Sequence, residues 1–364
     1  MSSHCTDITD LFFALVRCGI GKEKSLPYSP TPEEWRNLFE MAKKQTLIGI
    51  TFAGIEKLPS EQRPPKNIIL QWYTVSESIK STNADLNKKV TAISQKFKAE
   101  GFNNSILKGQ GIARLYPNPL LRTPGDIDIW LEGEEKKIIS YVKSIIPACS
   151  PTYHHIDFPV TNDVDIEIHY RPSWMCNPIN DKRIQQFYTA QANELFTCAT
   201  ETEDFPVPGI AFNRIFILHH IYRHLFSEGI GIRQVLDYYF VMQQKMTEEE
   251  KQVYINQLKE FGLYKFASAV TYVMQRMFAL DNEHTIVEPN KKEGEFLLHE
   301  IMTAGNFGIY DPRYTSTVHG LNFAHISNIA RRSFTLFTHY PAETFWTPMF
   351  KIWHYFWRKR NNKK

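Results

Sequence analysis

The sequence predicts an α+β protein in which a small mixed sheet lies between two helical regions. Apolar residues recur with helical spacing before residue 100 and after residue 172. Between these points lie short strand-like segments, some alternating polar and apolar residues with a period of two, separated by glycines and prolines. We therefore expect an N-terminal helical region over 1–100, an α/β core over 101–172 and a C-terminal helical domain over 173–364.

The N-terminal region carries clear signals of helix boundaries. Thr31 can cap a helix that has Pro32 at its first position and Glu34 at its third, and helical spacing then continues to Leu47. Another helix is expected from about Ile68 to Glu100.

Composition and the N-terminal segment indicate a soluble protein. Hydrophobic residues make up 43% of the 364 residues, which is enough for buried cores, and the net charge is only +3. This balance of charges argues against an extended nucleic-acid-binding surface. The first apolar run follows Asp7 and Asp10 and lacks a basic segment, so it predicts an amphipathic helix and not a signal peptide. No apolar stretch reaches the roughly 18 residues of a membrane span, and we expect a cytoplasmic protein.

Cysteine spacing argues against a zinc site. The five cysteines are isolated from one another, and none forms a Cys-x-x-Cys pair. Free thiols in a reducing compartment are the simplest interpretation. The residues are Cys5, Cys18, Cys149, Cys176 and Cys198.

The segment 101–172 has the chemistry-bearing residues on its predicted strands. In order, we expect a strand at Ile106-Leu107, a glycine turn at Lys108-Gly109-Gln110-Gly111, a helix over Ile112–Tyr116, a strand over Gly125–Leu131, a helix over Glu134–Ile146, and a hairpin of His154–Phe158 with Val164–His169. Glycines after a strand allow backbone amides to approach phosphate oxygens.

Carboxylates at alternate positions of two strands predict a metal site. Asp126 and Asp128 share one face of their strand, and Asp165 and Glu167 share one face of another. Neighbouring carboxylates repel, and a divalent cation such as Mg²⁺ relieves that repulsion. Three carboxylates can hold two metal ions for an in-line displacement at phosphorus. An alternating strand is also typical of a solvent-exposed sheet face, so this alternative stays open.

The run LKGQGIARLYPNPLLRTPGDIDIWL resembles an uncharacterised bacterial family of the nucleotidyltransferase superfamily, which has a DNA polymerase beta-like fold. That family also shows a Glu-x-His strand end, matched by Glu167-Ile168-His169, and a helix-turn element. The helix-turn element is matched by His219, His220, His224, residues 229–234 and Asp237.

The resemblance implies a role for each matching position. Asp126 and Asp128 correspond to paired ligands of Mg²⁺ or Mn²⁺, and Glu167 to a third carboxylate that can act as base toward an acceptor hydroxyl. Gly109 corresponds to the glycine of a Gly-Ser turn that binds nucleotide phosphates. Gln110 stands where the family pattern has serine, so Lys108 and Arg122 are alternative phosphate ligands, or the nucleotide site is altered. The expected nucleotide-binding set is Lys108, Gly109, Gln110, Gly111, Arg122, His169 and Arg233.

Each of these positions also has a structural alternative. Lys108 and Arg122 can instead form salt bridges with local acids, and Asp165 competes with Glu167 as the third carboxylate. Histidines in a partly buried sheet are often only hydrogen-bonded structure, and the helix-turn residues either line the cleft or lock their turn. The positions with such alternatives further include His154, His155, His169, His220, His224, Arg233, Gln234 and Asp237.

The leading hypothesis is an enzyme that transfers a nucleoside monophosphate from a nucleoside triphosphate to a hydroxyl of a small-molecule or protein acceptor. A degenerate binding module and a metal-dependent phosphohydrolase are the alternatives, and a nucleic-acid acceptor is disfavoured. The aromatic and basic segment 346–364 is expected to dock its aromatic residues on the helical domain and leave its last lysines in solvent, and binding to a membrane surface or to an acidic partner is the alternative.

Overall fold

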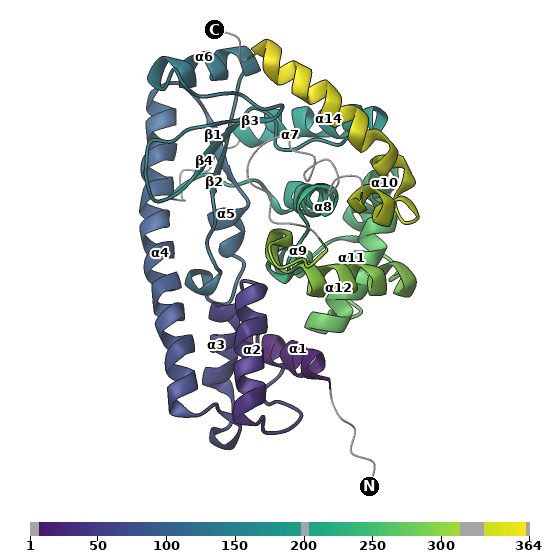
Figure 1. Cartoon of the computed structure of the whole chain (residues 1–364). Helices are drawn as coiled ribbons and strands as arrows, with labels where there is room; N and C mark the ends of the chain where they lie inside the picture. The colour runs from purple at the N-terminus through teal and green to yellow at the C-terminus, as the bar shows by residue number, and fades with distance from the viewer. Residues whose placement is uncertain (1–6, 198–203, 314–330, 362–364) are drawn as a thin grey trace.

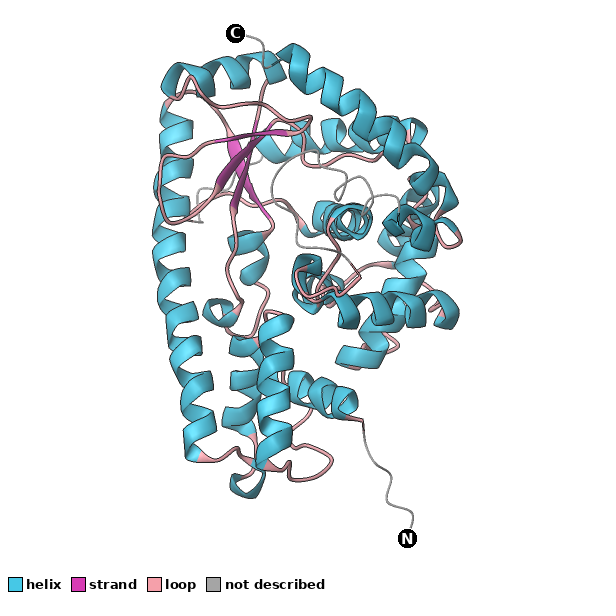
Figure 2. Ribbon diagram, in the orientation of Figure 1, coloured by secondary structure: helices cyan, strands magenta, loops and turns pink. Residues whose placement is uncertain are grey.

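A computed structural model describes residues 7–197, 204–313 and 331–361 of the chain. Helices surround one small sheet, as Figure 1 shows by element and Figure 2 by type of secondary structure. The predicted α+β architecture is confirmed. Cys5, Cys198 and the last two lysines of segment 346–364, Lys363 and Lys364, lie outside the described residues.

The N-terminal helices follow the boundary signals of the sequence. They are α1 (Ile8–Gly19), α2 (Pro32–Lys44), α3 (Ile48–Lys57), the 3₁₀ turn η1 (Ser60–Gln62) and α4 (Lys66–Ala99). The capping box of α2 is present, because Thr31 Oγ1 accepts from the Glu34 amide at 3.2 Å and Glu34 Oε2 accepts from the Thr31 amide at 2.7 Å. The amphipathic helix expected near the N-terminus is present as α1: residues 11–16 are buried against neighbouring helices, whereas Asp10 and Arg17 are partly exposed and form salt bridges with Arg276 and Glu23.

The sheet has four short strands in the order β1-β2-β4-β3. They are β1 (Asn104–Leu107), β2 (Ile127–Leu131), β3 (His155–Asp157) and β4 (Ile166–His169). The expected antiparallel hairpin of β3 and β4 is confirmed, whereas β2 and β4 are parallel, which makes the sheet mixed. Between strands lie α5 (Gly109–Ala113), η2 (Pro119–Leu121) and α6 (Glu135–Ile145). The helix expected at 112–116 thus begins three residues earlier and ends at Ala113.

The sheet has its own hydrophobic core, and α4 contributes to it. Figure 1 shows α4 running the length of the molecule, so that its first half packs on the N-terminal helices and its second half on the sheet. Val90 and Phe97 of α4 are fully buried against Ile129 and Ile168 of the sheet. The division of the chain at residue 100 stays a prediction, and α4 packs on both sides of it.

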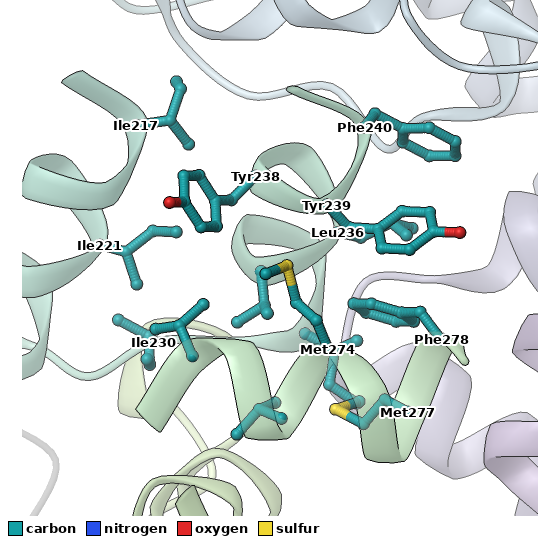
Figure 3. Close-up of a cluster of buried hydrophobic side chains, with 14 of the residues drawn as sticks. Ile217, Ile221, Ile230, Leu236, Tyr238, Tyr239, Phe240, Met274, Met277 and Phe278 are labelled. Atoms are coloured by element: carbon teal, nitrogen blue, oxygen red, sulfur yellow. The ribbon is translucent and has the colours of Figure 1, made fainter. Parts of the chain in front are cut away.

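The C-terminal region is helical where the structure describes it. Its elements are α7 (Pro178–Thr197), α8 (Ile210–Ser227), α9 (Ile232–Met242), α10 (Glu248–Glu260), α11 (Tyr264–Phe278), α12 (Lys291–Ala304), the 3₁₀ turn η3 (Asn306–Gly308), a helical stretch at 331–337 and α14 (Pro341–Asn361). Ile217, Leu236, Tyr239, Met274 and Phe278 belong to the core between α8, α9 and α11 (Figure 3). No helix within the described ranges is long and apolar enough to cross a bilayer.

Glu343 fastens α14 to the start of α7. Its carboxylate accepts hydrogen bonds from the amides of Cys176 at 2.5 Å and Asn177 at 3.2 Å. Burial, partly offset by these two bonds, raises the pKa of Glu343 to about 7. Cys18, Cys149 and Cys176 are free thiols, as expected for those three positions.

Candidate functional site

A cavity of about 180 Å³ lies between the sheet and helices α8 and α9. One wall comes from the sheet and its loops, and the opposite wall from the helix-turn segment between residues 217 and 237. Lining residues from the sheet side are Lys108, Gly109, Arg122, Gly125, Asp126, His154, His155 and Glu167, and those from the helical side include His220, Arg223, His224, Glu228, Arg233, Gln234 and Asp237. Most of the residues singled out from the sequence therefore meet at one place.

Strand pairing brings the carboxylates together. β2 and β4 run parallel with Asp128 directly opposite Glu167, so both side chains leave the same face of the sheet. Asp126 precedes the first residue of β2, is exposed, and lines the cavity with Glu167. Asp128 lies deeper and is only 1% exposed. Asp165 is exposed and lies outside the cavity lining, so the geometry favours Glu167 as the third carboxylate.

Asp128 has one oxygen that is paired and one that is not. Its Oδ1 lies 2.9 Å from Lys108 Nζ and 2.8 Å from His169 Nε2. Its Oδ2 is buried and has no hydrogen-bond partner among the described residues. Burial alone would raise the pKa of Asp128, but the charge of Lys108 and the hydrogen bond from His169 lower it. The carboxylate is therefore ionised and keeps a free oxygen.

His169 is a cation between two carboxylates. Its Nε2 lies 3.2 Å from Glu167 Oε2 as well as close to Asp128, and its Nδ1 donates to the Arg171 carbonyl at 3.3 Å. Although burial disfavours its charged form, the hydrogen bonds to Asp128 and Glu167 raise the pKa of His169 to about 9. Burial would raise the pKa of Glu167, but the His169 hydrogen bond and the charges of His155 and Lys108 hold it at about 2.

The carboxylates fit a divalent cation. The carboxylate oxygens of Asp128 and Glu167 lie within 4.8 Å of each other and of the His169 ring nitrogen, which carries a proton and hydrogen-bonds both carboxylates instead of binding an ion. The unpartnered Oδ2 of Asp128 is a buried polar atom of the kind that a ligand normally satisfies. Ionised oxygens, with Asp126 on the wall of the same cavity, are the donors that Mg²⁺ and Mn²⁺ prefer.

A strained turn holds Lys108 against Asp128. Lys108 has φ 48° and ψ −142°, and Gly109 has φ 36°. A non-glycine residue at positive φ costs on the order of 1–3 kcal/mol and persists where its surroundings enforce it. Here the ammonium–carboxylate contact lies at the cavity wall and compensates for that strain.

Gln110 and Gly111 lie away from the cavity, contrary to expectation. The Gln110 side-chain amide donates to Asn83 at 3.3 Å and Asn87 at 2.7 Å, both on α4. A Cβ on Gly111 would approach the Ile106 carbonyl to 3.0 Å, so this glycine permits close packing of α5 on β1. The turn of α5 rotates both residues toward α4 and the strand, leaving only Lys108 and Gly109 at the cavity.

Arg122 forms a salt bridge with Asp237, which is the structural alternative to binding phosphate. Its Nε and Nη2 contact the two oxygens of Asp237 at 2.7 and 2.8 Å, and Tyr116 donates to the same carboxylate at 2.6 Å. Although burial opposes its charge, Asp237 raises the pKa of Arg122. The pair joins the loop before β2 to α9 at the edge of the cavity.

Two arginines line the cavity without a carboxylate partner. Among the described residues, no carboxylate oxygen forms a salt bridge with Arg223 or Arg233, and the Nε of each is buried and unpaired. Arg233 Nη1 donates to the Thr123 carbonyl at 2.8 Å, and the Arg223 guanidinium lies 4.2 Å above the Trp174 ring. Burial lowers the pKa of both. Sequence reasoning missed Arg223, although it lies between two histidines that were singled out.

The histidines divide into structural and cavity-facing groups. His219 is structural, since it bonds to Tyr188 Oη at 2.7 Å and to the Trp174 carbonyl at 3.0 Å. His224 bonds to Glu228 at 2.5 Å on the cavity wall. His220 lines the cavity and has no hydrogen bond to any residue that the structure describes, which leaves its ring available to a ligand.

Comparison with known proteins places the chain in a family. No curated protein matches the sequence. A solved structure, an antigenic nucleotidyltransferase-like protein from Paracoccidioides brasiliensis, aligns with a TM-score of 0.34 and 12% identity over 58% of this chain and 96% of that one. The family model described as an uncharacterised nucleotidyltransferase matches residues 31–279. The chain, matched over most of its length and across the whole of the sheet, belongs to this nucleotidyltransferase family.

Proposed function

We propose that this protein transfers a nucleoside monophosphate from a nucleoside triphosphate to an acceptor hydroxyl, with Mg²⁺ or Mn²⁺ held by Asp126, Asp128 and Glu167. The family supplies the reaction class. The observation that carries the proposal is the free, buried Oδ2 of Asp128 opposite Glu167 on a parallel strand pair. A bound divalent ion would supply positive charge to the phosphate oxygens and align the attacking oxygen.

The arginines are proposed to bind the triphosphate. Arg223 and Arg233 are cations without a carboxylate counterion among the described residues, and phosphate oxygens are their natural partners. Lys108 and Gly109 lie on the opposite wall. The cavity of about 180 Å³ is smaller than pockets that enclose a whole drug-sized ligand. We expect it to enclose the phosphates and leave the base outside.

The reaction forms a bond between the acceptor oxygen and the α-phosphorus and breaks the bond from that phosphorus to the bridging oxygen. Pyrophosphate leaves, and Glu167 accepts the hydroxyl proton at the cavity wall. His155 Nδ1, 3.2 Å from Glu167 Oε2, orients this carboxylate. Lys108 and the arginines stabilise the charge that develops on the phosphate oxygens.

A catalytically inactive binding protein is the second candidate, and one observation favours it. Lys108 and His169 both contact Asp128 Oδ1, so two cations already neutralise part of the charge that a metal would neutralise. Such a protein would bind a nucleotide without releasing pyrophosphate. A phosphohydrolase would release nucleoside monophosphate or phosphate and leave no adduct on the acceptor.

Calorimetric titration of ATP, GTP, CTP and UTP in the presence of Mg²⁺ tests the site. Asp126→Asn is the diagnostic variant because Asp126 is exposed at the cavity, and Asp165→Asn is the matched control because Asp165 is exposed outside it. Asp126→Asn should weaken metal-dependent binding on the order of tenfold or more, with Asp165→Asn unchanged. The proposal would be contradicted if both variants bound nucleotide with equal affinity, or if the folded wild-type protein bound no nucleotide. Pyrophosphate release during an acceptor screen then excludes the inactive binding protein, and a nucleotide adduct on the acceptor excludes the phosphohydrolase.

A further inference from the structure

The outer face of α14 carries a stripe of exposed apolar side chains. Phe345, Met349, Ile352 and Phe356 recur at helical spacing, and Ile352 and Phe356 are 61% and 64% exposed. Soluble proteins rarely leave a large continuous apolar surface in water, and such a surface marks an interaction site. Figure 1 shows α14 along the outer edge of the molecule.

The opposite face of α14 fixes the helix to the protein. Phe350 stacks on Trp174 at a centroid distance of 5.9 Å, and Trp353 meets Tyr153 edge-on at 5.3 Å. Thr344 and Thr347 are buried beside Glu343. Aromatic residues of the segment therefore dock on the protein through one face of α14, as predicted. The contacts of that face hold the helix in place without the exposed stripe.

Charge on this part of the chain is strongly one-sided. Between residues 331 and 361 the one acidic residue is Glu343, which is buried. Arg358, Lys359 and Arg360 are all exposed at the end of α14, two to four residues after Phe356. Exposed basic residues beside aromatic residues complement a surface that is both negatively charged and apolar beneath.

We propose that α14 docks this protein on the surface of an anionic lipid bilayer. The apolar stripe would enter the region between headgroups and acyl chains, and the basic residues would contact the phosphates. Tyrosine favours this boundary, and Tyr355 is exposed beside Phe356. The three basic residues that follow the stripe complement lipid phosphates, which favours an anionic bilayer as the partner of this face. α14 lies on the membrane in this proposal, and no helix of the described residues could span it.

Co-sedimentation of the full chain with phosphatidylcholine vesicles, with and without phosphatidylserine, tests the proposal. Binding should require phosphatidylserine and weaken when salt rises from about 0.1 M to about 1 M, because the Debye length falls from about 10 Å to about 3 Å. Neutralising Arg358, Lys359 and Arg360 together as glutamine should reduce partitioning on the order of 100-fold.

The apolar stripe is tested with Ile352→Gln/Phe356→Gln. Leu70→Gln/Val253→Gln is the matched control, since those residues are similarly exposed on other helices. The stripe variant should lose vesicle binding and the control should keep it, with circular dichroism showing both folded. Equal binding by both variants, no preference for phosphatidylserine, or a dimer in sedimentation velocity that the stripe variant abolishes without any vesicle binding would overturn the proposal.

Discussion

Asp237→Asn removes the charge from the most heavily hydrogen-bonded carboxylate beside the cavity. Asp237 is 5% exposed and accepts three hydrogen bonds, two from Arg122 at 2.7 and 2.8 Å and one from Tyr116 at 2.6 Å. The substitution leaves the guanidinium of Arg122, which is 4% exposed, without its counterion, and the charge of Arg233 lies nearby. Breaking a buried pair in this way costs about 3–5 kcal/mol of the free energy of unfolding.

Urea unfolding followed by tryptophan fluorescence measures this loss. Arg122→Met/Asp237→Leu removes both charges and should recover most of the stability, because no buried charge is left unpaired. Asp85→Asn is the control, since its pair with Lys88 is mostly exposed and is expected to contribute less than about 1 kcal/mol. A cost for Asp237→Asn below about 1 kcal/mol would refute the reasoning. Nucleotide binding retained by the double variant would establish that Arg122 is structural.

The remaining predictions concern the cavity, α14 and helix packing. Arg233→Met should weaken nucleotide binding on the order of 10- to 100-fold by calorimetry, with the exposed Arg36→Met as an unaffected control. Because the raised pKa of Glu343, about 7, makes the folded chain bind this proton more tightly than the unfolded chain, the free energy of unfolding should fall by up to about 3 kcal/mol as pH rises from about 5 to about 8. Glu343→Gln should flatten that pH profile, and an unchanged slope would assign it to other groups. Gly49→Ala would put a Cβ 2.3 Å from the Leu121 carbonyl oxygen and should cost about 1–3 kcal/mol in denaturant, whereas unchanged stability would mean that the helix shifts freely.

Several elements could be predicted because their signals are local. The capping box at Thr31 and Glu34 depends on residues three apart in the sequence, and it starts α2 as predicted. Period-two alternation likewise identified β2 and β4, with Asp128 and Glu167 on matching faces. The role of these carboxylates as metal ligands stays a prediction. The amphipathic pattern of α1 also predicted a helix, although how much of its surface is buried depends on neighbours distant in sequence.

The sequence by itself determined that strands lie between two helical regions, which residues alternate on β2 and β4, and which family the chain resembles. Only the tertiary structure decided that β2 and β4 are parallel neighbours, that Arg122 pairs with Asp237, and that Arg223 faces the carboxylates across the cavity. Short-range patterns are set by backbone geometry and side-chain period, which any stretch of chain carries within itself. Pairings between residues that are distant in the sequence depend on how whole elements pack, and their energies arise from burial that no local stretch of sequence contains.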